Sequence, residues 1–154
     1  EVAAALGLAQ TERLEKIIDL RIKISDLFHE AVSDCNFITP QKTPKGYLNS
    51  YWCYTVKFEH EYVSWKEFRN KFSSFGGDGI YAAWTLSYEE TVMSSEIYKK
   101  KAPYYYKNLS YKKGICPVAE TIQPKLMQFV TNYRNLSEAK LQIRALKQTI
   151  DFFS

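Results

Sequence analysis

The sequence predicts an α+β domain: a small, mostly antiparallel sheet of about three strands packed against helices, with a long helix at the N-terminus. Three observations favour this class. Helical and β-type segments alternate in the order α-β-α-β-α-β-α, the strand candidates are short, and the connections between them differ in length. The alternation also allows a parallel α/β sheet, the less favoured alternative. We expect a single domain over 1–154, with a helix over 1–34 and an α+β body over 35–154.

Residues 1–34 have the periodicity of an amphipathic helix. Apolar residues recur at three-, four- and seven-residue steps on one face: Leu14, Ile17, Ile24, Phe28 and Ala31. The helix has no capping residue at its start, and at about 1.5 Å per residue it would span roughly 50 Å. That is longer than a compact domain of this size needs. We therefore expect the chain to be a fragment of a larger parent protein, with this helix bracing two domains.

Two features predict where the strands lie. Pro40, Pro44 and Gly46 interrupt residues 36–49, which we expect to form a loop with one short edge strand. Runs rich in β-branched and aromatic residues predict the buried strands. These strand candidates cover residues 51–58, 80–86 and 126–131.

Local start and stop signals define the helix in the middle of the chain. Ser64 and Glu67 have the spacing of a capping box. The helix that they start should end at Gly76-Gly77, where a left-handed backbone costs little. We expect it to bury three aromatic residues, Trp65, Phe68 and Phe72.

The C-terminal third carries similar signals. Pro117 suits the first turn of a helix that starts at Cys116, and Pro124 should bend or end that helix. Ser137 is the predicted N-cap of a final helix that runs to about Phe152, with Glu138 beside the positive helix end. We expect its buried side to include Leu141, Ala145, Ile150 and Phe152.

The net charge of +4 comes from one segment. Residues 98–114 contain six lysines, five tyrosines and no acidic residue. Interleaved Lys and Tyr side chains could pair with phosphates and stack on bases. The favoured interpretation is a solvated loop whose Tyr rings pack on the domain while the Lys stems reach toward water. A third possibility is a basic loop near a phosphorylated small substrate.

Composition disfavours several classes of protein. No apolar run reaches the roughly 20 residues that a membrane-spanning helix needs. Cys35, Cys53 and Cys116 form no CxxC pair and favour a reducing cytosol over a disulfide scaffold, so we expect a cytoplasmic protein without a membrane partner. His29 lies beside Glu30 without a second histidine at i+4, and His60 lies between Glu59 and Glu61 in an expected turn. Because a zinc site needs three or four convergent ligands, structural or solvated roles are favoured over metal binding for both histidines.

The chain carries no catalytic signature of its own. It has no G-x-S-x-G elbow and no cysteine with a matching histidine context. Residues 75–79 are glycine-rich, but they lack the P-loop Lys and Ser/Thr and favour a turn. Trp84, with Tyr81 and Tyr88 nearby, follows this turn on a strand candidate. Such aromatic residues either pack in a core or stack on a sugar or base ring, and their spacing leaves both open.

Several of these motifs resemble the DegT/StrS family of sugar aminotransferases, which are pyridoxal-phosphate (PLP) enzymes of fold type I. The segment from Val2 to Gln10, followed by Leu14 and Arg21, is similar to the stretch that follows the family's cofactor-binding lysine region. Further matches occur in the family's order at residues 49–56, 65–79, 116–120 and 137–150.

The resemblance implies that this chain is the C-terminal small domain of a PLP-dependent aminotransferase, which helps to close over the substrate and supports a homodimer. Such enzymes transfer an amino group, usually from glutamate, to a keto sugar carried by a nucleotide, as in lipopolysaccharide or polysaccharide biosynthesis. The family's Schiff-base lysine lies upstream of the matched stretch. We therefore expect no cofactor, catalytic residue or metal ligand in this chain, which would be inactive alone. Its partners would be the large domain and the nucleotide-sugar substrate.

The segment after the glycine turn departs from the family's pattern of a His-Tyr pair followed by Pro-Leu-His. Tyr81 stands at the first His position, Ala82 at the Tyr position and Ser87 at the later His position, so no acid–base histidine is expected. Tyr81 and Trp84 are the predicted substrate-binding residues, in contact with a sugar or base ring. The alternative function is a free-standing module that binds nucleic acid or an acidic polymer through residues 98–114.

Overall fold

The computed structural model describes residues 1–82, 84–95, 100–101, 103–106 and 111–154. The helices are α1 (Val2–Thr11), α2 (Leu14–Val32), α3 (Trp65–Ser74), α4 (Thr91–Ser94), α6 (Pro103–Tyr106), α7 (Pro117–Ile122) and α8 (Leu136–Phe153), with 3-10 turns η1 (Ser87–Glu89) and η2 (Gln123–Lys125). The strands are β1 (Ile38–Pro40), β2 (Cys53–Phe58), β3 (Ile80–Ala82) and β4 (Leu126–Val130).

The strands form one antiparallel sheet. Among the described residues it has four strands in the order β1-β2-β4-β3, and each neighbouring pair is antiparallel. This confirms the predicted α+β class and excludes the parallel alternative. The sheet is one strand larger than expected because the short edge strand in the 36–49 loop, β1, pairs with β2. Pro40 ends β1 at the sheet edge, where a residue without an N–H is tolerated.

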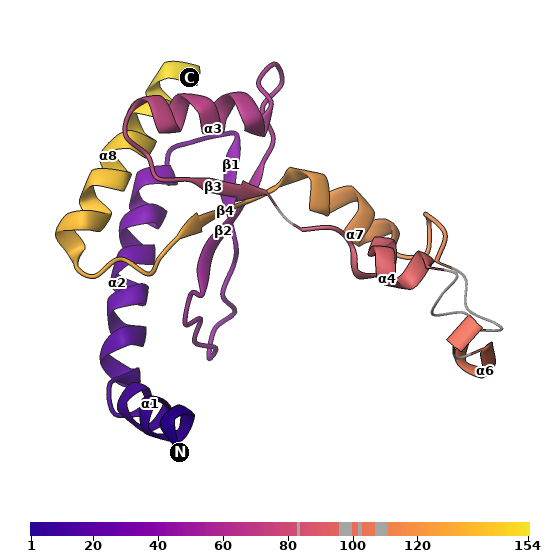
Figure 1. The fold of residues 1–154 in the computed structure, drawn as a ribbon. Coiled ribbons are helices and arrows are strands. Elements are labelled where there is room, and N and C mark those ends of the chain that lie inside the picture. Colours follow the sequence, from indigo (N-terminus) through magenta and orange to yellow (C-terminus); the bar gives the residue numbers. More distant parts are fainter. Residues whose placement is uncertain (83, 96–99, 102, 107–110) are drawn as a thin grey trace.

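Helices α2, α3 and α8 cover one face of the sheet and form the core with it (Figure 1). Alternate side chains of β2 and β4 point into this core, as the two-residue period of a strand requires. The rings of Phe28 on α2 and Phe129 on β4 have centroids 5.2 Å apart, and Phe129 meets Phe72 of α3 at 5.8 Å. One aromatic layer thus joins two helices to the central strand pair.

The predicted single helix over 1–34 is two helices. After α1, the amide of Arg13 donates to the carbonyl of Gln10, so the helical four-residue step becomes a three-residue step at the junction. The Thr11 hydroxyl also donates to the Gly7 carbonyl at 2.9 Å, a local bond that often bends helices. No residue of α1 is buried, so no core packing keeps it in line with α2, and α1 turns away from the α2 axis (Figure 1).

The last helix begins two residues earlier than predicted. The cap is Asn135, whose side-chain oxygen accepts from the Glu138 amide at 3.0 Å, and the Glu138 carboxylate accepts from the Arg134 amide at 3.1 Å. The predicted cap Ser137 therefore lies inside the first turn. Because the packed face of α8 is set by its contacts with α2 and α3, Ala145 and Ile150 are buried as expected, whereas Leu141 and Phe152 are exposed.

The predicted capping box of α3 is confirmed. The Glu67 amide donates to the Ser64 hydroxyl, and the Glu67 carboxylate accepts from the Ser64 amide at 2.8 Å. Phe68 and Phe72 are fully buried, while Trp65 is half-buried. The helix ends at the predicted Gly76-Gly77 turn, where Gly76 has a φ of +89°.

The chain between β3 and β4 leaves the sheet and carries α4, α6 and α7 on an extended arm (Figure 1). A polar cluster ties this arm together: the Glu120 carboxylate accepts from the Tyr88 hydroxyl and from the amides of Gly114 and Cys116. The hydrogen bond from Tyr88 is the main reason that the pKa of Glu120 lies below its usual value. The predicted helix start at Cys116-Pro117 is confirmed, and α7 ends before Pro124.

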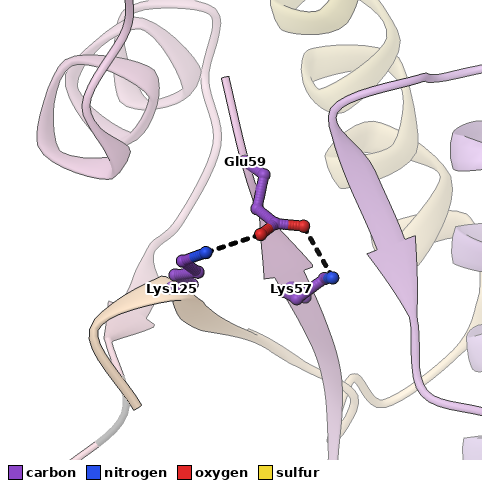
Figure 2. Close-up of polar contacts among 3 residues, drawn as sticks. All are labelled: Lys57, Glu59 and Lys125. Atoms are coloured by element: carbon purple, nitrogen blue, oxygen red, sulfur yellow. Dashed lines mark hydrogen bonds and ion pairs between the residues drawn. The ribbon is translucent and has the colours of Figure 1, made fainter. Parts of the chain in front are cut away.

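An ion bridge joins the end of β2 to the start of β4. Figure 2 shows the Glu59 carboxylate between two ammonium groups, with Lys57 Nζ at 2.6 Å and Lys125 Nζ at 2.7 Å. Hydrogen bonds from the two lysines lower the pKa of Glu59 from 4.5 to about 2, and the bond from Lys125 has the larger effect. The folded protein therefore holds this carboxylate charged at pH values where the unfolded chain has protonated it.

The Glu59 bridge gives stability a defined pH dependence. A carboxyl group whose pKa is lower in the folded state stabilises the fold above the unfolded value, here 4.5, and loses that contribution as the pH falls to about 2. We expect Glu59→Gln to lower the melting temperature above pH 5.5 and to match the wild type near pH 2. Glu61→Gln is the control, with no such pH-dependent difference. A Glu59→Gln deficit that is unchanged from pH 7 to pH 2 would contradict the assignment.

Candidate functional site

The face of the sheet opposite the helices carries the candidate site. Because side chains alternate along each strand, this face holds Cys53 and Thr55 of β2, Gln128 of β4 and Tyr81 of β3. The register pairs Gln128 with both Thr55 and Tyr81, so these three residues form a row across the sheet. Its members are half-buried, except Tyr81, which is exposed.

Trp52 reaches this face through an unusual backbone turn. Tyr51, just before it, has a φ of +49°, a left-handed conformation that is uncommon for a bulky residue. Thr131 donates its hydroxyl to the carbonyls of Tyr51 and Trp52, at 2.7 and 3.1 Å. Arg21 Nη1 donates to the same carbonyls, at 3.4 and 3.0 Å. These hydrogen bonds stabilise the left-handed turn and thereby fix the position of the Trp52 indole.

The predicted residue Trp84 lies against Trp52. The two rings meet edge to face, with centroids 6.1 Å apart and an interplanar angle of 76°. The Trp84 carbonyl accepts a 2.9 Å hydrogen bond from Gln123 Nε2, which anchors its backbone to η2. Trp52 is 68% exposed and Trp84 is 72% exposed, so a large aromatic surface faces outward.

These residues enclose a pocket of about 230 Å³. Its lining brings together both predicted site residues, Tyr81 and Trp84, with side chains from α2, β2 and β4. The full lining is Arg21, Trp52, Cys53, Tyr81, Trp84, Gln128, Phe129, Val130 and Asn132. The pocket thus combines aromatic walls with amide groups and one guanidinium.

The chemistry of the lining is that of binding. The nine lining residues include no carboxylate, imidazole or amine that could take up or release a proton near neutral pH. Indole and phenol rings offer stacking surfaces, and the amides of Gln128 and Asn132 offer both hydrogen-bond donors and acceptors. The arrangement suits a ring that carries hydroxyl groups.

Both histidines contact other parts of the chain. His60 Nδ1 accepts from the amides of Tyr62 and Val63 at 3.1 Å, and His60 Nε2 lies 3.1 Å from the Phe153 carbonyl. His29 Nδ1 lies 3.3 Å from the Tyr54 hydroxyl. The described residues contain no group of three or more potential ligands for a metal ion.

Three further predictions concern the basic segment, the cysteines and membrane-spanning helices. Residues 98–114, which carry the alternative function of binding nucleic acid or an acidic polymer, lie partly outside the described residues. Cys35, Cys53 and Cys116 are free thiols. In the part of the chain that the structure describes, no helix has the length and apolar character to cross a bilayer.

The sequence did not identify Arg21 and Trp52 as site residues. Trp52 has the same parity as the buried residues Tyr54 and Val56, so strand periodicity places it in the core. The left-handed turn at Tyr51 instead places the Trp52 side chain on the open face of the sheet. This turn is stabilised by Thr131, which is 80 residues away in sequence. The only local signal was the Asn at position 49, whose side chain accepts from the Tyr51 amide in a turn typical of asparagine.

Comparisons with known proteins give the family. Residues 1–143 match the DegT/DnrJ/EryC1/StrS aminotransferase family, and the chain belongs to that family. No curated protein sequence matches the chain.

Solved structures share the fold at low sequence identity. A DegT DnrJ EryC1 StrS aminotransferase from Brucella abortus is 16% identical, with a TM-score of 0.65 over 96% of this chain and 34% of that one. The aminotransferase TlmJ from Streptoalloteichus hindustanus is 17% identical, with a TM-score of 0.68 over 99% and 37%. DesV from S. venezuelae is 17% identical, with a TM-score of 0.67 over 96% and 36%. The chain therefore spans about a third of the length of these structures.

The pocket does not fit PLP as a covalently held group. PLP enzymes bind this cofactor through an imine to a lysine, and the described residues that line the pocket include no lysine. The lining residues offer a ligand stacking surfaces, hydrogen-bonding amides and one positive charge.

Proposed function

We propose that this chain is the C-terminal small domain of a PLP-dependent aminotransferase that transfers an amino group, from glutamate, to a nucleotide-linked keto sugar. Family membership supports the reaction class, and a similar structure from Streptococcus pneumoniae is a PLP form. The observation that carries the proposal is the outward-facing pocket in which Tyr81 and Trp84 lie together. In this proposal the domain binds and covers the sugar, and the cofactor and its lysine belong to the rest of the enzyme.

Exposed aromatic side chains support the sugar-binding role. An indole face packs favourably against the apolar C–H surface of a sugar ring, and the ring's hydroxyls can bond to amides nearby. Trp84 and Tyr81 supply the faces, while Gln128 lies next to Tyr81 in the sheet register and Asn132 completes the lining. Proton transfer would fall to groups outside this lining.

Exposed apolar surface supports a second, larger domain as partner. Helix α1 has no buried residue, and its apolar side chains Val2, Leu6 and Leu8 are all more than half exposed. A helix with this much uncovered apolar surface gains its stability from packing against another element. We propose that α1 packs on the large domain of the aminotransferase, which acts as a homodimer in the cytoplasm.

The decisive experiment is an assay of the enzyme that contains this domain. Glutamate-dependent amination of nucleotide keto sugars should be detectable, and Trp84→Ala should raise KM about tenfold, the effect of losing one ring-stacking contact. Trp84→Phe should restore most of the affinity because it keeps an aromatic face.

Tyr62→Ala is the matched control, since Tyr62 is 81% exposed and lies outside the pocket. Its KM should equal that of the wild type. Absence of amination with every keto sugar tested would remove the proposed reaction. An unchanged KM in Trp84→Ala would remove the sugar-binding role of this pocket.

A further inference from the structure

Arg21 is a half-buried cation whose position is fixed by backbone groups. Its Nη1 donates to the carbonyls of Trp52 and Tyr51, which also accept from the Thr131 hydroxyl. Among the residues that the structure describes, no carboxylate forms an ion pair with Arg21. The guanidinium is thus held in place without neutralisation of its charge.

Part of this guanidinium remains available. An arginine has five N–H donors in a planar fork, and Nη1 accounts for the contacts to Trp52 and Tyr51. No hydrogen bond to a described residue involves Nε or Nη2. These two nitrogens form the edge of the fork that matches two oxygens of a carboxylate or phosphate. A partly desolvated cation with a free edge of this kind favours an oxyanion nearby.

Arg21 and Trp52 line two adjoining hollows. One is the pocket of about 230 Å³ on the sheet face opposite the helices. The other, of about 420 Å³, lies between the start of α2 and residues 50–52. Both residues contribute to both linings, so they stand at the boundary between the two spaces. A ligand that extends past them would place a ring against the indoles of Trp52 and Trp84 and a charged group at Arg21.

We propose that Arg21, Trp52 and Trp84 form a subsite for a sugar ring that carries a phosphate, with the ring against the two indoles and the phosphate oxygens accepting from Nε and Nη2 of Arg21. The inference rests on the proposed function, since it assigns the phosphate-bearing part of the same substrate to named residues. It requires only binding and no amination, so the two can fail separately.

The test is a titration of the 154-residue chain, followed by tryptophan fluorescence at low salt. UDP-glucose and dTDP-glucose should change the fluorescence saturably, and methyl glucoside, which has the ring without the charge, should not. Binding should weaken as NaCl is added because the contact with Arg21 is electrostatic. Glucuronate tests a carboxylate in place of the phosphate: binding as tight as that of UDP-glucose would overturn the phosphate assignment.

Substitutions separate charge recognition from folding. Arg21→Gln should weaken binding by about tenfold or more, the effect of removing a hydrogen bond to a charged group, and should flatten the salt dependence. Arg21→Lys keeps the charge but not the fork, so it should retain the salt dependence at lower affinity. Arg144→Gln, which removes an exposed charge outside both hollows, should bind like the wild type.

Melting curves identify any variant that fails to fold, and in that case Arg21→Lys carries the test alone. Absence of saturable binding by the wild type would overturn the subsite, as would equal affinity and equal salt dependence in the wild type and the folded Arg21 variants. If the complete enzyme still aminates nucleotide keto sugars after such a result, only the role of Arg21 is wrong. If the chain binds UDP-glucose with the expected salt dependence but the complete enzyme aminates no keto sugar, only the proposed reaction is wrong.

Discussion

Replacing Phe28 with alanine is expected to lower the free energy of unfolding by about 3–5 kcal/mol, the range for truncating a buried phenylalanine. Phe28 has no exposed surface, stacks on Tyr54 at 5.4 Å and meets Phe129 at 5.2 Å. Its ring joins α2 to both central strands, so its loss leaves a cavity between the helix layer and the sheet. Urea denaturation followed by circular dichroism measures the change. A loss of this size is a large part of the 5–15 kcal/mol typical of a whole domain.

Phe152→Ala is the matched control because it removes the same atoms from α8. Phe152 is 58% exposed, and its ring contacts the ammonium of Lys71, 3.6 Å from the ring centroid, and the Phe153 ring at 4.9 Å. We expect a loss of about 1 kcal/mol or less, as for an exposed cation–π contact. Equal losses for Phe28→Ala and Phe152→Ala would contradict the location of the core.

Gly77→Ala is expected to cost about 3 kcal/mol or more, at the upper end for overpacking a core. A Cβ on Gly77 would lie 2.3 Å from two ring carbons of Phe72 and 2.5 Å from a third. The Phe72 ring cannot give way, because it is fully buried and packs edge to face on Phe129 at 5.8 Å. Either the α3–β3 turn or the aromatic layer must move. Thermal unfolding of the variant measures the cost.

Gly76→Ala separates this clash from backbone strain. Gly76 has a φ of +89°, but a Cβ there would meet no atom within 4 Å. Its substitution should therefore cost only the strain of a left-handed alanine, about 1–2 kcal/mol. A larger loss in Gly76→Ala than in Gly77→Ala would show that the turn's conformation, and not the Phe72 ring, is the constraint.

The parts of this fold that sequence reasoning predicted depend on neighbours in the chain. The capping box of Ser64 and Glu67 is confirmed because both partners lie within one turn. The strand predicted over 51–58, which forms as Cys53–Phe58, and the helix start at Pro117 follow from equally local preferences. The α+β class followed because short strands and uneven connections favour antiparallel pairing.

Most of the features that were missed depend on contacts between residues far apart in the sequence. The start of α8 was missed for a local reason: two good caps, Asn135 and Ser137, lie two residues apart in the sequence, and the position of Glu138 three residues after Asn135 decides between them. The exposure of Leu141 depends on how α8 packs on α2, which no local pattern contains. In the candidate site, Tyr81 and Trp84 could be proposed from an aromatic cluster near a strand. Arg21 could not, because its role depends on a turn stabilised by Thr131.

The direct pairing of β3 with β4 has a consequence for how this domain can vary. Residues 83–125 connect two adjacent antiparallel strands, so in topological terms they replace the few residues of an ordinary hairpin turn. Doubling the length of such a connection costs only about 0.6 kcal/mol of closure entropy. Evolution can therefore lengthen, shorten or exchange this segment while the scaffold beneath it stays the same. Trp84 lies at the root of the exchangeable segment and Arg21 on the constant scaffold, so related proteins could acquire new ligand preferences by changing one loop.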